Sequence, residues 1–151
     1  MFRGANRLNL DAKGRLAMPT RYRGRLAECC ESELVITIDP DGCLAIYPLP
    51  EWLVVERKVM GMPSMNPAAR NLQRLFVGNA TDVSMDGQGR VLLPPTLREF
   101  AGLKKQAMLV GQVNRFELWD EEQWNDRMKS GIENFNSDRE NDPTDFSTLS
   151  F

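Results

Sequence analysis

The chain has 151 residues, enough for one ordinary domain or two small halves sharing a core, and 42% of them are hydrophobic, which predicts a folded globular protein. No apolar run is long enough to span a bilayer, and the N-terminus lacks the apolar core of a signal peptide, so we expect a cytoplasmic protein with no membrane partner. The absence of histidine removes the commonest general base and the usual zinc ligand. Three cysteines form no recognisable ligand set, so we expect no enzyme activity, no cofactor and no metal.

Charge is distributed unevenly along the chain, although the formal net charge is only −2. Residues 1–25 contain seven basic side chains and one acidic side chain, whereas residues 120–151 contain nine acidic and three basic ones. This segregation indicates a polyanionic partner for the basic end, or alternatively that the two ends neutralise each other. The sequence pI of about 5.3 counts against a simple basic nucleic-acid binder, so only a local field could attract DNA.

The first predicted elements are a strand, a tight turn and a second strand. Apolar residues alternate with polar or small ones at Leu8, Leu10, Leu16 and Met18. The turn begins at Asp11 and ends at Gly14, because Asp favours the first position of a type I turn and Gly supplies the left-handed residue of the following bulge. This geometry predicts a hairpin across which Asp11 and Arg15 can pair.

The remaining elements of the first half follow from turn and cap signals. Pro19 ends the second strand, since proline cannot donate to a central ladder, and it suits the first turn of a helix. In chain order we expect a helix over 19–26, strands over 34–38 and 43–47, and helices over 51–60 and 67–76, the last capped by Ser64 or Asn66.

The first half is repeated 75 residues later. Asp11, Gly14, Arg15, Pro19 and Arg23 recur as Asp86, Gly89, Arg90, Pro94 and Arg98. The second copy predicts a helix over 95–103, strands over 107–111 and 115–119, and a helix over 123–129. A single ββαββα unit cannot bury its apolar face alone, so we expect two copies to close around each other as a mainly β (α+β), pseudo-symmetric β-barrel.

The repeat also predicts the domain boundaries. We expect a first repeat over 5–52, a helical connector over 53–80, a second repeat over 81–124, and the end of a helix with an acidic, disordered tail over 125–151. The tryptophans Trp52, Trp119 and Trp124 occupy repeat positions that favour burial in the core.

The doubled motif resembles the signature of the MraZ family, the two-repeat branch of the SpoVT/AbrB-like DNA-binding proteins. Its copies read Asp11-Ala12-Lys13-Gly14-Arg15 and Asp86-Gly87-Gln88-Gly89-Arg90, each followed by an apolar strand and a proline. The resemblance covers about residues 1–130 and implies a swapped-hairpin, double-split β-barrel that assembles into ring-like homo-oligomers.

The resemblance also implies a function. Such a protein is a nucleoid-associated transcriptional regulator that binds double-stranded DNA at short G-rich direct repeats upstream of its own operon. The operon is the division and cell-wall gene cluster, and the usual effect is repression. A protein-interaction module is the alternative, since related AbrB-like folds serve as antitoxins.

Comparison of the two copies separates scaffold residues from candidate DNA contacts. The shared residues that the hairpins themselves require are Asp11, Gly14, Asp86, Gly89 and Arg90. Arg15 is suited either to pairing with Asp11 or to reading guanine, and the resemblance favours DNA contact. Lys13 becomes Gln88 in the second copy, and Arg21 becomes Thr96.

The first hairpin is therefore predicted to face DNA, while the second completes the barrel. The predicted DNA-binding residues are Arg3, Arg7, Lys13, Arg15 and Arg21. Arg21, Arg23 and Arg25 would equally suit a solvated helix face, and the recurrence of Arg23 as Arg98 favours a structural role for it.

Overall fold

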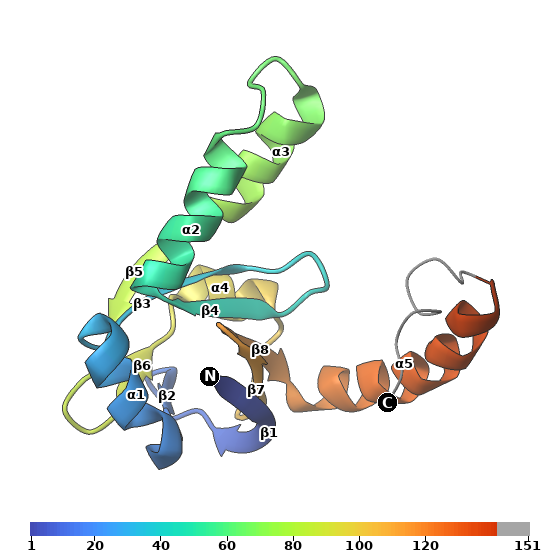
Figure 1. Ribbon diagram of the computed structural model, residues 1–151. Helices are drawn as coiled ribbons and strands as arrows, with labels where there is room; N and C mark the ends of the chain where they lie inside the picture. The colour runs from blue at the N-terminus through green and yellow to red at the C-terminus, as the bar shows by residue number, and fades with distance from the viewer. Residues whose placement is uncertain (142–151) are drawn as a thin grey trace. The chain divides into compact units, whose positions relative to one another are not determined.

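A computed structural model describes the backbone of residues 1–141 and the side chains of residues 1–137 (Figure 1). The chain divides into a unit over Met1–Asp120, which contains all the strands of the described residues, and a second unit that begins at Glu121. The first unit contains β1 (Phe2–Asn9), β2 (Arg15–Ala17), α1 (Thr20–Cys30), β3 (Glu33–Ile38), β4 (Leu44–Pro48), α2 (Leu49–Met60), α3 (Pro67–Phe76), β5 (Thr81–Ser84), β6 (Arg90–Leu92), α4 (Pro95–Phe100), β7 (Gln106–Val113) and β8 (Phe116–Asp120). The second unit contains α5 (Glu121–Asn141).

The strands of the two halves are interleaved. Six strands form one sheet in the order β1-β7-β8-β4-β3-β5, and β2 pairs with β6 in a separate two-stranded ribbon. Exchanging equivalent strands of the two halves (β1 with β5, β3 with β7, β4 with β8) maps the sheet order onto its own reverse. The sheet and the ribbon therefore share one pseudo-two-fold relation, and each half completes the ladders of the other.

The predicted fold class is confirmed at the level of a mixed α+β protein that is mostly β-sheet with short helices. The ladders do not close into a barrel, because within residues 1–141 β1 and β5 are the two edges of the sheet. The predicted pairing of the first two strands with each other was wrong. β1 pairs along its length with β7, and β2 pairs with β6, so these two strands are joined at the loop between them, where the amide of Asp11 donates to the carbonyl of Arg15 (3.0 Å).

Apolar side chains form a core on each face of the sheet. The larger core packs the ribbon, α1 and α4 against one face, with Leu16, Leu26 and Phe116 fully buried. The smaller core lies on the other face, where Trp52 of α2 covers Val35 and Tyr47. Trp52 and Trp119 are 3% and 4% exposed, which confirms the prediction that they are buried, whereas Trp124 of α5 is only half-buried, so the prediction was wrong for it.

The helices begin close to their predicted positions, but α1 continues to Cys30 beyond the predicted end at residue 26, and α4 ends at Phe100, before the predicted end at residue 103. α3 begins where expected, because Asn66 accepts a hydrogen bond from the amide of Ala68 (2.9 Å) and Pro67 occupies the first turn. α5 continues to Asn141, whereas the sequence predicted that regular structure would end at residue 129; the expectation of a disordered tail over 142–151 lies outside the described residues. No helix within residues 1–141 combines the length and apolarity needed to cross a bilayer.

A pair of arginines locks the two turns that precede the ribbon strands. Gly14 and Gly89 have φ values of +79° and +76°, and a Cβ on Gly14 would collide with the guanidinium of Arg98. A Cβ on Gly89 would collide in the same way with Arg23, whose Nε donates to the carbonyl of Met18 (2.7 Å). Each helix arginine thus packs on the turn of the opposite half, which confirms the structural role predicted for Arg23.

We expect Gly89→Ala to destabilise the protein more than either of two other glycine substitutions. Gly42→Ala, at φ +96° with open space around it, introduces backbone strain alone, on the order of 1 kcal/mol. Gly89→Ala adds displacement of Arg23, so its cost should exceed that of Gly42→Ala by at least about 1 kcal/mol. Gly87→Ala, in the same loop, has no neighbour within 4 Å and no positive φ and should be nearly neutral. Urea unfolding at one protein concentration measures all three, and equal costs at Gly42 and Gly89 would contradict the packing argument.

Candidate nucleic-acid interface

The β2–β6 ribbon has one buried face and one outward face. Its register pairs Leu16 with Val91, and both side chains are fully buried in the larger core. The flanking pairs, Arg15 with Leu92 and Ala17 with Arg90, point the other way because side chains alternate along a strand. The outward face therefore carries two arginines at opposite corners, with the exposed Leu92 and Ala17 completing it. We call these four residues the ribbon face.

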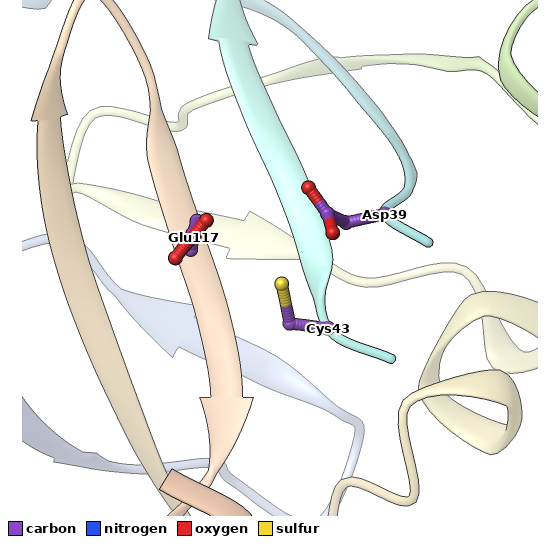
Figure 2. Close-up of side chains that lie close together, drawn as sticks. All are labelled: Asp39, Cys43 and Glu117. Atoms are coloured by element: carbon purple, nitrogen blue, oxygen red, sulfur yellow. The ribbon is translucent and has the colours of Figure 1, made fainter. Parts of the chain in front are cut away.

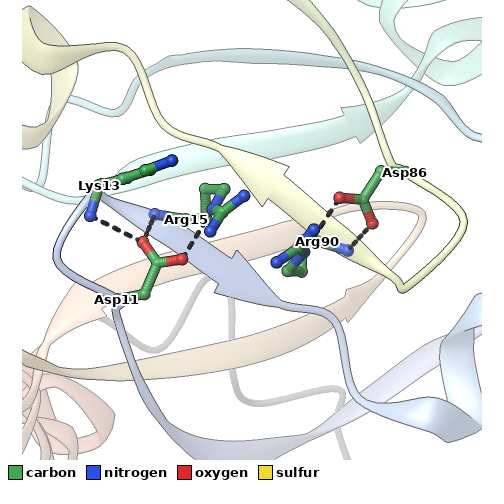
Figure 3. Close-up of polar contacts among 5 residues, drawn as sticks. All are labelled: Asp11, Lys13, Arg15, Asp86 and Arg90. Carbon is green, nitrogen blue, oxygen red and sulfur yellow. Dashed lines mark hydrogen bonds and ion pairs between the residues drawn. The ribbon is translucent and has the colours of Figure 1, made fainter.

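An aspartate fixes each arginine of the ribbon face (Figure 3). Oδ1 of Asp11 accepts hydrogen bonds from the backbone amides of Lys13 (3.0 Å) and Arg15 (2.8 Å), while Oδ2 accepts from Nε of Arg15 (2.7 Å). These bonds confirm the predicted Asp–Arg pair in the first loop. The carboxylate thus organises the loop and holds the guanidinium by its inner nitrogen.

The second loop repeats the arrangement of the first. Oδ1 of Asp86 accepts from the amides of Gln88 (2.9 Å) and Arg90 (2.9 Å), and Oδ2 accepts from Nε of Arg90 (3.0 Å). The arginine side chain is 36% exposed here, compared with 27% for Arg15. The terminal guanidinium nitrogens of Arg15 and Arg90 make no hydrogen bond to any described side chain or backbone group, so both remain available to a ligand.

The hydrogen bonds lower the pKa of both aspartates. The backbone amide of Arg15 has the largest effect on Asp11, followed by the Arg15 guanidinium and the amide of Lys13. The amides of Arg90 and Gln88 act on the pKa of Asp86 in the same way, together with the Arg90 guanidinium. A lowered pKa means that the stabilising effect is present above the ordinary value of 3.8 and is lost as the pH falls through the folded-state pKa. Both Asp–Arg pairs are therefore intact at neutral pH.

The structure groups Lys13 with Arg15 in the first loop. Lys13 is exposed, and its ammonium has no hydrogen-bond or ion-pair partner within the described residues. Its counterpart Gln88 occupies the same position in the second loop. The first loop, with Asp11, Lys13 and Arg15, has a formal net charge of +1, whereas the second, with Asp86, Gln88 and Arg90, is neutral.

Arg21 lies apart from the ribbon face, in a network that joins α1 to β1. Its Nη2 donates to Oδ1 of Asn6 (2.8 Å) and to the hydroxyl of Tyr22 (2.7 Å), and its Cζ lies 4.7 Å from the centre of the Tyr22 ring. The Tyr22 hydroxyl in turn donates to the carbonyl of Arg3 (2.6 Å). Arg21 therefore has a structural role, although its side chain remains exposed.

Arg3 and Arg7 are exposed residues of β1, in the six-stranded sheet and not in the ribbon. Phe2 and Leu8, on the opposite face of the strand, contribute to the larger core. The structure does not bring Arg3 or Arg7 to the ribbon face. Arg3 instead shares a small polar cavity of about 170 Å³ with Arg21 and the start of the chain.

Two lysines beside the first loop were missed from the sequence. Lys104 and Lys105 line a cavity of about 550 Å³ together with Asp11 and Arg98. The carbonyl of Lys105 accepts the amide of Leu10 (2.7 Å), which ties the α4–β7 connection to the entry of the loop. Both lysines are exposed. An adjacent pair of lysines is visible in the sequence, but only the interleaved strand order places it at this loop.

The second loop has no matching lysines. The equivalent contact is made by the carbonyl of Ser32, which accepts the amide of Met85 (2.9 Å), so Glu31 and Ser32 stand where Lys104 and Lys105 stand in the first loop. The ribbon is thus cationic at one end only. The sequence predicted this asymmetry from first-half cations such as Lys13 and Arg21, which become Gln88 and Thr96, and the structure adds the residues contributed by the other half.

Similarity to known proteins supports one family for the whole chain. Residues 1–75 and 76–146 both match the family model described as "MraZ protein, putative antitoxin-like". A protein of Thioalkalivibrio sulfidiphilus named Transcriptional regulator MraZ is 61% identical over 124 residues, which are 82% of this chain and 83% of the relative. Proteins of the same name from Pseudomonas aeruginosa (59% over 126 residues, 83% of each chain) and Halorhodospira halophila (56% over 128 residues, 84% of each) are also similar. The chain therefore belongs to the MraZ family.

Proposed function

We propose that this protein is a DNA-binding transcriptional regulator whose ribbon face enters the major groove. The observation that carries the proposal is the ribbon face itself, a two-stranded surface with an aspartate-held arginine at each of two opposite corners. The major groove of B-DNA admits a two-stranded β-ribbon. The names of the relatives, which describe transcriptional regulators, support the same reading.

Arginine chemistry accounts for base recognition. Because Nε of Arg15 is occupied by Asp11, the two terminal nitrogens project from the pair as a fork. Such a fork matches the O6 and N7 acceptors of guanine, the commonest specific contact in DNA complexes. Arg90 has the same geometry, so we include it as a second base contact beside its role in the loop. A G-rich recognition sequence follows from two such readers.

Phosphate contacts supply the affinity. Lys13, Lys104 and Lys105 surround the first loop, and lysine ammoniums bind phosphates without reading sequence. Arg3, Arg7 and Arg21 remain proposed DNA contacts along β1 and α1, where they would track the backbone beyond the ribbon. The first loop is then the principal contact, and the second contributes chiefly Arg90.

Several subunits are needed for tight binding by an acidic protein. One subunit with a few phosphate contacts would bind weakly and would lose affinity steeply with salt. We propose a ring-like homo-oligomer that binds short G-rich direct repeats, since linked sites gain by effective concentration. We further propose a nucleoid-associated cytoplasmic repressor of its own operon in the division and cell-wall gene cluster.

The architecture behind this function is proposed to be a swapped-hairpin, double-split barrel, with the β2–β6 pairing as the exchange between repeats 5–52 and 81–124. Residues 53–80 would act as the helical connector, and the acidic segment over residues 125–151 would belong to neither repeat.

The substitution Arg15→Ala should weaken binding to a G-rich site by about 1–3 kcal/mol per occupied site and relax the preference for one guanine. Arg15→Lys should restore phosphate attraction but not base preference, because an ammonium lacks the planar fork. Competition binding against single-base variants of the site measures both effects. An unchanged base preference in Arg15→Ala would rule out base reading by this residue.

Removing the cation at Lys13 should weaken binding to all sequences alike. The binding constant K falls as the salt concentration rises. Lys13→Ala is expected to make the plot of log K against log salt concentration less steep, by about 1 for each bound subunit, because one phosphate contact is lost. Gln88→Lys should make the same plot steeper, because it adds a cation to the neutral loop. Lys58→Ala removes the same charge from exposed α2 and serves as the control. Equal slopes for Lys13→Ala and Lys58→Ala would remove Lys13 from the interface.

The antitoxin-like alternative is separated by a truncation. A chain that ends at residue 130 lacks most of the acidic segment but retains the ribbon face and both loops. A regulator that reads DNA through the ribbon should keep its footprint upstream of its own gene. Loss of the footprint, with retained oligomer size by light scattering, would instead favour a protein whose activity depends on the C-terminal segment.

A further inference from the structure

Three potential metal ligands converge at the β3–β4 turn, away from the ribbon (Figure 2). Asp39 follows β3, Cys43 precedes β4, and Glu117 lies on β8. One ligand atom from each residue lies within 4.8 Å of the other two. The sulfur of Cys43 lies between the two carboxylates in Figure 2.

The local backbone holds each ligand in place. The amide of Asp39 donates to the carbonyl of Cys43 (2.9 Å), which closes the turn and fixes these two residues against each other. The pairing of Ala45 with Glu117 brings β8 alongside. Oδ1 of Asp39 accepts the amide of Asp41 (2.8 Å), and this bond orients the carboxylate.

The carboxylate of Glu117 is oriented by a residue of its own strand, β8. Its Oε1 accepts a hydrogen bond from the indole Nε1 of Trp119 (3.2 Å), which leaves Oε2 without a donor in the described residues. Outer hydrogen bonds of this kind commonly orient carboxylate ligands in metal sites. Both carboxylates of the cluster are therefore oriented by hydrogen bonds from groups outside it.

The cluster has no ion-pair partner in the described part of the chain. Within residues 1–137 neither Asp39 nor Glu117 forms an ion pair with a lysine or arginine. Cys43 is completely buried, and its sulfur has no hydrogen-bond partner among the same residues. Two half-buried carboxylates therefore face a buried thiol with no ion pair to either of them, an arrangement that a bound cation would stabilise.

The cluster takes ligands from both repeats and is not duplicated. By the pairing of β4 with β8, the residue equivalent to Cys43 is Arg115 and the residue equivalent to Glu117 is Ala45. The duplicated scaffold consequently does not require these two ligands, which indicates a role for them beyond folding.

We propose that Asp39, Cys43 and Glu117 form a Zn²⁺ site with solvent in the fourth position. Zn²⁺ takes cysteine sulfur and carboxylate oxygen together in tetrahedral geometry, whereas Mg²⁺ and Ca²⁺ prefer oxygen ligands alone. On binding, the thiol loses its proton to solvent and sulfur forms the bond to zinc. Burial and the adjacent Asp39 carboxylate raise the pKa of the Cys43 thiol. The metal would join the first repeat to the second through β4 and β8.

The test uses the full-length protein after treatment with a chelator, titrated with Zn²⁺ by calorimetry and with Co²⁺ by absorption. We expect one metal per chain, and for Co²⁺ both a tetrahedral d–d spectrum and a near-ultraviolet thiolate-to-cobalt band. Cys43→Ser should abolish that band. Glu117→Gln and Asp39→Asn should each weaken Zn²⁺ binding by at least about tenfold, since losing a ligand exceeds the effect of losing an outer-shell partner.

Two control variants separate this site from incidental binding. Cys29→Ser removes the exposed cysteine of α1, and Asp82→Asn removes an exposed carboxylate of β5; both should bind Zn²⁺ like the parent. A cobalt–thiolate band that survives Cys43→Ser but disappears in Cys29→Ser would overturn the proposal in favour of an adventitious ion only. Absence of 1:1 binding, or equal binding by the parent, Glu117→Gln and Asp39→Asn, would also overturn it. The two carboxylate variants keep the test decisive if Cys43→Ser does not fold.

Discussion

The antiparallel ladder between β2 and β6 is the interaction on which the rest of the structure depends. It has three residue pairs, extended at either end by the amide of Met18 bonding to Gly89 (2.7 Å) and that of Leu93 bonding to Gly14 (3.1 Å). Each ribbon strand therefore ends on the turn glycine of the opposite half. The same ladder buries Leu16 and Val91 and turns both motif arginines outward, so folding and the candidate DNA surface are set by one set of hydrogen bonds.

An aspartate next to an arginine proposed to read DNA opposes phosphate attraction, yet the geometry gives the carboxylate a structural purpose. Asp11 accepts three N–H groups, two from the loop backbone and one from Arg15. A free arginine loses about 2 kcal/mol of rotamer entropy when it is immobilised, and holding Nε in advance reduces that loss on binding. Since the pair has no net charge, attraction to the backbone falls to residues such as Lys13. Under the proposed function, base reading and affinity would thereby be divided between different side chains.

Local chemistry was predictable from the sequence, whereas the choice of non-local partners was not. Turn preferences predicted the loops and the Asp–Arg pairs, and the Asn66 cap placed the start of α3 correctly. Alternation identifies the buried face of a strand but not its neighbour, so β1 was paired with β2 instead of β7. The contribution of Lys104 and Lys105 depends on that neighbour. Composition and weak apolar periodicity predicted no regular structure for residues 131–141, yet α5 continues through them.

A duplicated scaffold with equal charges at both loops would bind DNA equally well in two orientations related by its pseudo-two-fold axis. The cations beside the first loop and Glu31 beside the second remove that equivalence. Under the proposed function, a subunit then favours one direction along the duplex, and neighbouring subunits related by rotation around a ring would all point the same way. Direct repeats present their half-sites in one direction, whereas palindromes alternate. On this proposal, the divergence of two otherwise matching loops would provide the polarity that a head-to-tail operator requires.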